Sequence, residues 1–227
     1  MITDLKAIDK YLVPNGWYTV CMDIIDIISL IFIYVVAITI HEYSHAAVAH
    51  RLGDPTAKHE GRLTLNPLAH IDPFTTLALP VLLIIAGSPV IFGAARPVPF
   101  NPNMVKGENK GAALVALAGP VSNLLLAVLI GIIIRFVPTL YVAGGGLLVS
   151  MMWVNIALAL FNLLPIPPLD GSRVVYAFAP ASFQDAMERF ERSGPIVILL
   201  IFLVGYPFIA PFLGSATKAI TGFILGL

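Results

Sequence analysis

The chain is short of charge and of cysteine. Lysine, arginine, aspartate and glutamate make up 11% of its 227 residues, whereas about 25% is usual in soluble globular domains. The 13 basic and 13 acidic residues cancel to a formal net charge of zero, which excludes the strongly basic surface of a nucleic-acid-binding protein. Cys21 is the single cysteine, so the chain can form neither an intrachain disulfide nor a cysteine-based zinc site.

The sequence also lacks a signal-peptide pattern and an interdomain linker. Its first residues do not show the compact basic and then apolar order of a cleaved signal peptide. No stretch rich in serine, glycine or charge divides the chain. We therefore expect a single membrane-embedded domain over residues 1–227. Its core lies at about 24–171, and residues 172–227 add an interfacial helix and one or more C-terminal helices.

Apolar residues take the place of charge. They make up 58% of the chain, and the mean hydropathy is +0.91, which is typical of a polytopic helical membrane protein. The pattern predicts a first transmembrane helix at about Asp23–Leu52. Further helices are predicted at about Gly111–Val137, Gly146–Leu164 and Pro195–Leu213.

Two segments between the first and second helices have a different character. Phe74–Ala95 is apolar, but glycine, serine and proline interrupt it near its centre, which favours a segment that enters the membrane and returns. Lys58–Leu65 has the pattern of a short hairpin or edge strand. The expected fold is therefore an all-α bundle of about four to six transmembrane helices, with a re-entrant segment at about 74–95 and a short hairpin at about 58–65.

The C-terminal part is less uniform. Ser182–Arg192 is polar and helical in pattern, and we expect it to lie at the membrane interface. Residues 215–227 are expected to form a short extra helix or a tail.

The sequence HEYSH at residues 41–45 is the strongest chemical signal in the chain. On a helix, its HExxH spacing places His41 and His45 one above the other on one face. Two imidazoles can bind one Zn²⁺, and Glu42 between them can accept a proton from zinc-bound water. The preceding stretch, Ile27–Ile40, carries no charge. The pattern therefore predicts a zinc-hydrolase site inside a membrane.

A catalytic zinc needs a third protein ligand and one open position. Asp170 is the best candidate, because it follows an apolar helix on a backbone that contains three prolines. Ionisable residues at membrane depth are functional candidates, although an Asp-Gly pair is also a common turn signal. We expect His50, His59 and His70 not to be ligands.

Three motifs together resemble the site-2 protease family of intramembrane zinc metalloproteases. They are HExxH in the first core helix, Gly-Pro-Val-Ser-Asn at residues 119–123, and Asn-Leu-Leu-Pro-Ile-Pro-Pro-Leu-Asp-Gly at residues 162–171. Asn66-Pro67 and the Pro97-Val98-Pro99 stretch are similar to compact prokaryotic members of the family. Many relatives carry a PDZ or CBS domain, and we expect neither here. The resemblance implies one catalytic zinc bound by His41, His45 and Asp170.

The resemblance also implies roles for three more residues. Glu42 is the general base, and Asn123 and Asn162 match positions that line the catalytic cavity. Either amide could stabilise the oxyanion of the tetrahedral intermediate. Asparagines also hold membrane helices together, so a purely structural role stays open for both.

The predicted site constrains the topology. The His pair and Asp170 each lie at the C-terminal end of a helix, so these two helices must cross in the same direction to share one zinc. One full crossing, Gly111–Val137, lies between them, and Phe74–Ala95 must therefore be re-entrant. This places nine of the 13 basic residues on the face of the site, which is then cytoplasmic by the positive-inside rule: Arg51, Lys58, Arg62, Arg96, Lys106, Lys110, Arg173, Arg189 and Arg192.

These inferences predict an intramembrane zinc endopeptidase of a prokaryotic cell membrane. Its substrate is a transmembrane helix of another protein, cut in regulated intramembrane proteolysis, and no nucleic acid is involved. One alternative is a non-catalytic metal-binding or chaperone-like protein that holds transmembrane helices. Glu42 argues against it, because structure alone gives no reason for a carboxylate between two ligands. A zinc transporter is a weaker alternative, because no second set of ligands is present across the helices.

Overall fold

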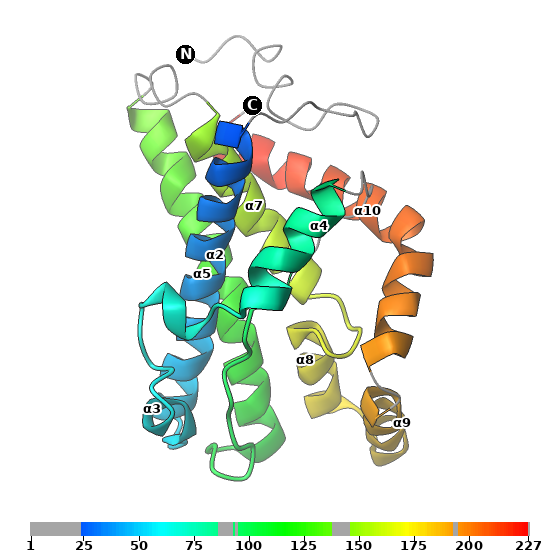
Figure 1. Cartoon of the computed structure of the whole chain (residues 1–227). Coiled ribbons are helices and arrows are strands. Elements are labelled where there is room, and N and C mark those ends of the chain that lie inside the picture. The colour runs from blue at the N-terminus through cyan, green and yellow to red at the C-terminus, as the bar shows by residue number, and fades with distance from the viewer. Residues whose placement is uncertain (1–23, 86–92, 94, 138–145, 193–194, 227) are drawn as a thin grey trace.

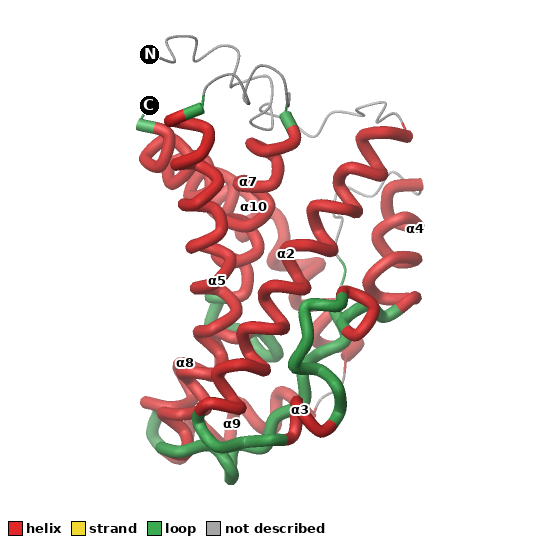
Figure 2. The backbone as a smooth tube through the Cα atoms, turned by 90° about the vertical axis from the view of Figure 1, so that its left-hand side faces the viewer, coloured by secondary structure: helices red, strands yellow, loops and turns green. Residues whose placement is uncertain are grey.

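The computed structural model describes residues 24–85, 93, 95–137, 146–192 and 195–226. Over these ranges the protein is helical and contains no strand (Figures 1 and 2). Four helices form the body of the bundle: α2 (Ile24–Arg51), α5 (Glu108–Phe136), α7 (Leu147–Asn162) and α10 (Pro195–Leu225). The all-α prediction is confirmed.

Three of these helices are long and apolar enough to cross a membrane. They contain the candidate spans Ile27–Arg51, Glu108–Phe136 and Val204–Leu225, and the 16-residue α7 is also apolar. Large apolar side chains such as Phe208 and Phe223 point outwards and are exposed, which suits a surface that faces lipid. The composition and the fold therefore agree on a multi-pass membrane protein.

The larger core cluster lies where α7 and the C-terminal end of α10 pack against α5. Ile134 of α5 and Met152 and Ile156 of α7 are fully or almost fully buried there. In Figure 1, α2 and α7 descend from the end that bears the N-terminus, and α5 ascends. The two helices that were expected to run in the same direction therefore do so.

The segment between α2 and α5 turns back on itself, as predicted. It begins with η2 (Pro73–Ala78), a π-helical turn, and continues into α4 (Leu79–Ile85). The backbone N–H of Arg96 then donates a hydrogen bond of 2.9 Å to the His70 carbonyl, so the two ends of the segment meet. The break at residues 87–89 lies outside the described residues. Figure 2 shows α2 between α5 and α4.

The hairpin predicted at Lys58–Leu65 is wrong. Residues 56–59 form the short helix α3 (Thr56–His59), and the backbone N–H of Arg62 bonds back to the Ala57 carbonyl. Gly61 has a φ of +67°, which ends the helix in the usual way. Local turns therefore satisfy the backbone groups that a strand would have paired. Another short turn, η1 (Pro67–Ala69), precedes α4.

The C-terminal part contains three helices. α8 (Asp170–Phe178) was not predicted, and α9 (Ala181–Arg192) matches the expected polar helix. The predicted end of the next helix at Leu213 is wrong, because α10 continues through Gly214 to Leu225. A glycine inside a helix costs about 1 kcal/mol. Packing of Ile220, Ile224 and Leu225 against the α5–α7 core offsets that cost.

Candidate metal centre

Helix α2 presents two histidines side by side near the middle of the bundle. His41 and His45 lie one turn apart and are only 5% and 8% exposed. Their ring centroids are 4.6 Å apart, and the ring planes are nearly perpendicular at 84°. The HExxH spacing has therefore produced the predicted pair on a single face.

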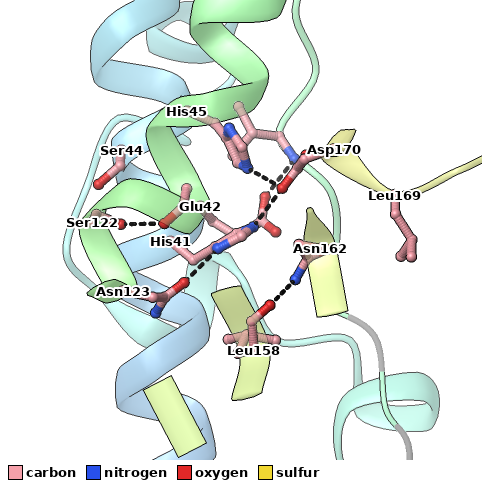
Figure 3. Close-up of polar contacts among 12 residues, drawn as sticks. His41, Glu42, Ser44, His45, Ser122, Asn123, Leu158, Asn162, Leu169 and Asp170 are labelled. Atoms are coloured by element: carbon pink, nitrogen blue, oxygen red, sulfur yellow. Dashed lines mark hydrogen bonds and ion pairs between the residues drawn. The ribbon is translucent and has the colours of Figure 1, made fainter. Parts of the chain in front are cut away.

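Asp170 completes this group from the first residue of α8. Its Oδ2 lies 3.1 Å from Nε2 of His41 and 3.3 Å from Nε2 of His45 (Figure 3). That oxygen is buried and has no hydrogen-bond partner. The structure thus brings together three side chains that lie up to 129 positions apart in the chain, as the numbering shows.

These residues fit a zinc ion. Their ligand atoms all lie within 4.8 Å of one another, and ligands placed tetrahedrally at 2.0–2.1 Å from zinc are about 3.3 Å apart. The neighbouring helix leaves room, because a Cβ on Gly119 would be 2.4 Å from Nε2 of His45 and 2.6 Å from Nε2 of His41. The group therefore combines suitable donor atoms, suitable spacing, and space for the ion beside the bare backbone of Gly119.

Each histidine is oriented through its other ring nitrogen. Nδ1 of His45 lies 2.7 Å from the Val115 carbonyl, which can only accept, so this nitrogen carries the proton. Nδ1 of His41 lies 2.6 Å from Oδ1 of Asn123, which is likewise an acceptor. Both Nε2 atoms then keep a lone pair for a metal, the arrangement that zinc-binding histidines adopt.

Glu42 is held by the non-helical segment that precedes α5. The backbone N–H of Val98 donates a hydrogen bond of 3.0 Å to its Oε2. Pro97 and Pro99 have no N–H, so Val98 supplies the one backbone donor of this tripeptide. The half-buried carboxylate is therefore fixed through one oxygen, and the other makes no hydrogen bond within the described part of the chain, so a substrate or a water can use it.

Val98 belongs to a cover segment, residues 95–106, that follows α2 towards its C-terminal end. The backbone N–H of Asn101 donates to Oδ2 of Asp54 at 2.6 Å, and the N–H of Lys106 donates to the Leu52 carbonyl at 2.9 Å. The cover segment is thus attached to α2 at Glu42 and again, at Leu52 and Asp54, just beyond the C-terminal end of the helix.

Asp54 is the main anchor of that second attachment. Its side chain is buried and also accepts hydrogen bonds from the backbone and hydroxyl of Thr56. Burial by itself raises the pKa of this carboxyl, but the bonds from Thr56 and Asn101 outweigh it and hold the pKa below its ordinary value. The cover segment is therefore tied to a carboxylate that is ionised at neutral pH.

The two predicted cavity asparagines differ in their contacts. Asn123 is fully buried, and its Nδ2 donates to the Ala37 carbonyl and to Oδ1 of Asn155. Both amide hydrogens are engaged, which argues against an oxyanion role for Asn123. Asn162 is half-buried, and its Nδ2 donates to the Leu158 carbonyl of its own helix (Figure 3), which leaves one amide hydrogen.

Sequence reasoning missed several residues that shape the site. Gly119 and the donor at Val98 lie inside motifs that were noticed, but only the fold shows what they contact. Asn155 is a polar residue in an apolar helix, and that contrast was a usable signal. His50, His59 and His70 lie outside the metal-binding group that the described residues form. His70 donates through Nε2 to the Thr64 carbonyl at 2.8 Å.

The fold and the site together define a helical membrane protein with a metal group of the hydrolase type. The model of peptidase family M50 matches residues 145–206. YwhC of Bacillus subtilis, which is named as a zinc metalloprotease, is 41% identical over 185 residues, covering 77% of this chain and 80% of that protein.

Two mycobacterial relatives with the same description are called Rip2. The protein of Mycolicibacterium smegmatis is 31% identical over 179 residues, which is 76% of this chain and 68% of the relative. The protein of Mycobacterium tuberculosis is 32% identical over 172 residues, which is 75% and 64%. No solved structure gave a significant match.

The chain therefore belongs to peptidase family M50, and the resemblance to site-2 proteases is confirmed. It is a metalloprotease, and its cofactor is zinc.

Proposed function

We propose that this metalloprotease is an intramembrane endopeptidase that hydrolyses peptide bonds in transmembrane segments of other membrane proteins, in regulated intramembrane proteolysis. The position of the His pair supports this most directly. His41 lies inside the candidate span Ile27–Arg51, ten residues or about 15 Å from Arg51 along the helix. A peptide bond cut there must enter the membrane part of the protein.

His41, His45 and Asp170 are the proposed ligands. Bound there, a zinc ion would acidify a coordinated water and polarise the scissile carbonyl. Glu42 would accept the proton of the attacking water and transfer it to the leaving amine. No covalent intermediate with the protein is needed, and Ser44 has no part in it, because its hydroxyl donates to the Ile40 carbonyl of its own helix.

Asn162 is the proposed donor to the oxyanion. The bond to the Leu158 carbonyl uses one amide hydrogen of Asn162 and leaves the second available, whereas both hydrogens of Asn123 are engaged. A positioned amide donor stabilises the charge that develops on the carbonyl oxygen. Asn123 instead supports the site by orienting His41.

We further propose that the active site faces the cytoplasm of a prokaryotic cell. The His pair lies nearer to the Arg51 end of α2 than to the other end. Arg51, Arg96 and Lys106 belong to the nine basic residues predicted on that membrane face, and the positive-inside rule assigns such a face to the cytoplasm. A Lys106→Cys variant in a Cys21→Ser background tests this. Membrane-impermeant maleimide should label it in inverted vesicles and not in intact cells, and the reverse result would overturn the orientation.

The function is tested with purified protein in detergent and a model transmembrane substrate. Wild type should cleave it, and Glu42→Gln should not, while both bind one equivalent of zinc. Cleavage by both proteins would point to a contaminant or to another base. Zinc binding without cleavage, across a panel of transmembrane substrates, would support the non-catalytic metal-binding alternative.

A further inference from the structure

Helix α7 buries an asparagine that the proposed chemistry does not use. Asn155 is 0% exposed and lies in the apolar sequence LLVSMMWVNIALALFN. A buried amide is unfavourable unless hydrogen bonds satisfy it. Its partners therefore indicate why the helix carries it.

Asn155 joins the metal group through one intermediate residue. Nδ2 of Asn123 donates to Oδ1 of Asn155 at 2.8 Å, and Nδ2 of Asn155 donates to the Met151 carbonyl at 2.8 Å. Since Oδ1 of Asn123 faces Nδ1 of His41, a continuous chain of polar contacts runs from α7 through α5 to α2.

The direction of this chain is fixed at its ends. The carbonyls of Met151 and Ala37 can only accept hydrogen bonds, so each carbonyl must face an Nδ2 group. Asn155 therefore turns Nδ2 to Met151 and Oδ1 to Nδ2 of Asn123, whose other amide hydrogen faces Ala37. Asn123 is then obliged to present Oδ1, and not Nδ2, to His41. His41 in turn must carry its proton on Nδ1, which leaves the lone pair of Nε2 directed at Asp170 and the metal position.

We propose that Asn155 is a positioning residue for the zinc site, which acts through Asn123 to hold His41 in its metal-binding tautomer. The inference rests on zinc being bound by His41, His45 and Asp170. Without Asn155, one amide hydrogen of Asn123 loses its partner inside the bundle, and the bond to the Ala37 carbonyl is then, among the described residues, the one remaining contact of Nδ2 that opposes rotation of the amide. Rotation of that amide by half a turn would then place its Nδ2 against His41 and move the imidazole proton to Nε2, where it blocks the metal.

The test measures zinc affinity by chelator competition in detergent, and the melting temperature of the zinc-free protein separately. Asn155→Leu should weaken zinc binding by about 10- to 100-fold, the range seen when groups that orient a ligand are lost. A residue with a purely structural role would lower the melting temperature and leave the zinc affinity within twofold of wild type. That result would overturn the proposal.

Thr217→Val is the matched control. Thr217 is also fully buried in the bundle, on α10, and its hydroxyl has no hydrogen-bond partner. Its replacement should leave the zinc affinity unchanged. Failure of the wild-type protein to bind zinc would instead reject the metal assignment itself, and zinc binding without cleavage would bear on the proposed function and leave Asn155 testable.

Two further variants test the route through Asn123. If Asn155 acts through Asn123, the combined Asn123→Ala and Asn155→Leu changes should weaken zinc binding no more than Asn123→Ala alone, because coupled residues are not additive. Additive losses would overturn the proposal. Asn155→Asp keeps an oxygen for Asn123 and should bind zinc more tightly than Asn155→Leu. Equal affinities would contradict the role, even if the leucine variant folds poorly.

Discussion

The two sides of the metal group are built by different means. On the α5 and α7 side, helices supply the Val115 carbonyl, the Asn123 amide and the bare backbone of Gly119. On the other side, the cover segment reaches Glu42 through a single backbone N–H, that of Val98. Helix packing therefore places the proposed ligands, whereas a non-helical segment places the proposed base.

This difference indicates which properties can be altered separately. The residues that orient the ligands are buried between helices, where any change of volume is costly. The cover segment is tied to α2 by hydrogen bonds at a few points. Changes on the helix side should therefore affect zinc binding, and changes on the cover side should affect turnover while zinc remains bound.

The largest effect is expected on the helix side at Gly119. The added methyl of Gly119→Ala would lie within 2.6 Å of Nε2 of both histidines, in the space that the metal needs. Zinc affinity should fall by more than about 100-fold, beyond the usual effect of losing an orienting group. Chelator competition measures this.

Gly214→Ala is the matched control for that change. A Cβ at Gly214 meets no atom within 4 Å, and alanine is the better helix former. Zinc affinity should be unchanged and the melting temperature equal or higher. If Gly119→Ala bound zinc as tightly as this control, the metal could not lie against α5.

The next largest effect is expected in the cover segment at Val98, and it should alter turnover without altering zinc binding. Val98→Pro removes the backbone N–H that holds Glu42, while Val98→Ala removes only the side chain. Loss of a hydrogen bond to a charged group costs about 1.5–3 kcal/mol, which corresponds to a decrease of about 10- to 100-fold in kcat/KM for the proline variant. Alanine should retain most activity, and both should bind zinc normally. A proline variant as active as the alanine variant would show that the Val98 bond does not matter for turnover.

A smaller effect is expected at the distal attachment of the cover segment. The folded-state pKa of Asp54 is lowered, so its carboxylate adds stability above the ordinary aspartate pKa of about 3.9. That stability is lost as the pH falls through the lowered pKa. Asp54→Asn should melt at a lower temperature than wild type at pH 6, and the difference should shrink towards pH 3. A difference in melting temperature that does not change with pH would contradict a stabilising role for the ionised Asp54 carboxylate.

The smallest effect is expected at Ser122, within the same motif as Gly119. Its hydroxyl donates to the Gly119 carbonyl of its own helix at 2.7 Å and orients no ligand. Ser122→Ala should change the free energy of unfolding by no more than about 0.5 kcal/mol and leave zinc affinity unaltered. A large loss of zinc affinity would extend the ligand-orienting surface of α5 beyond Gly119 and Asn123.

Much of the fold followed from apolar patterning, and the failures have physical causes. The helices around residues 24–51, 108–136 and 147–162 were predicted to within a few residues, because long apolar runs must be helical in a membrane. The hairpin at 58–65 and the helix end at Leu213 were wrong, because local turns and packing against α5 and α7 outweighed weak local signals. The short helix α8 was missed, because proline dominates the sequence before it.

The sequence alone indicated the chemistry proposed for this protein. The 3.6-residue helical repeat places His41 and His45 on one face with Glu42 between them in sequence, and Asp170 was the best candidate for a third ligand. Only the tertiary structure decided how these groups are oriented. The partners of His41, His45 and Glu42 are Asn123, the Val115 carbonyl and the Val98 N–H, which lie 56 or more positions away along the chain. Contacts of that kind depend on how helices pack and where the cover segment returns, and neither is encoded in a local pattern.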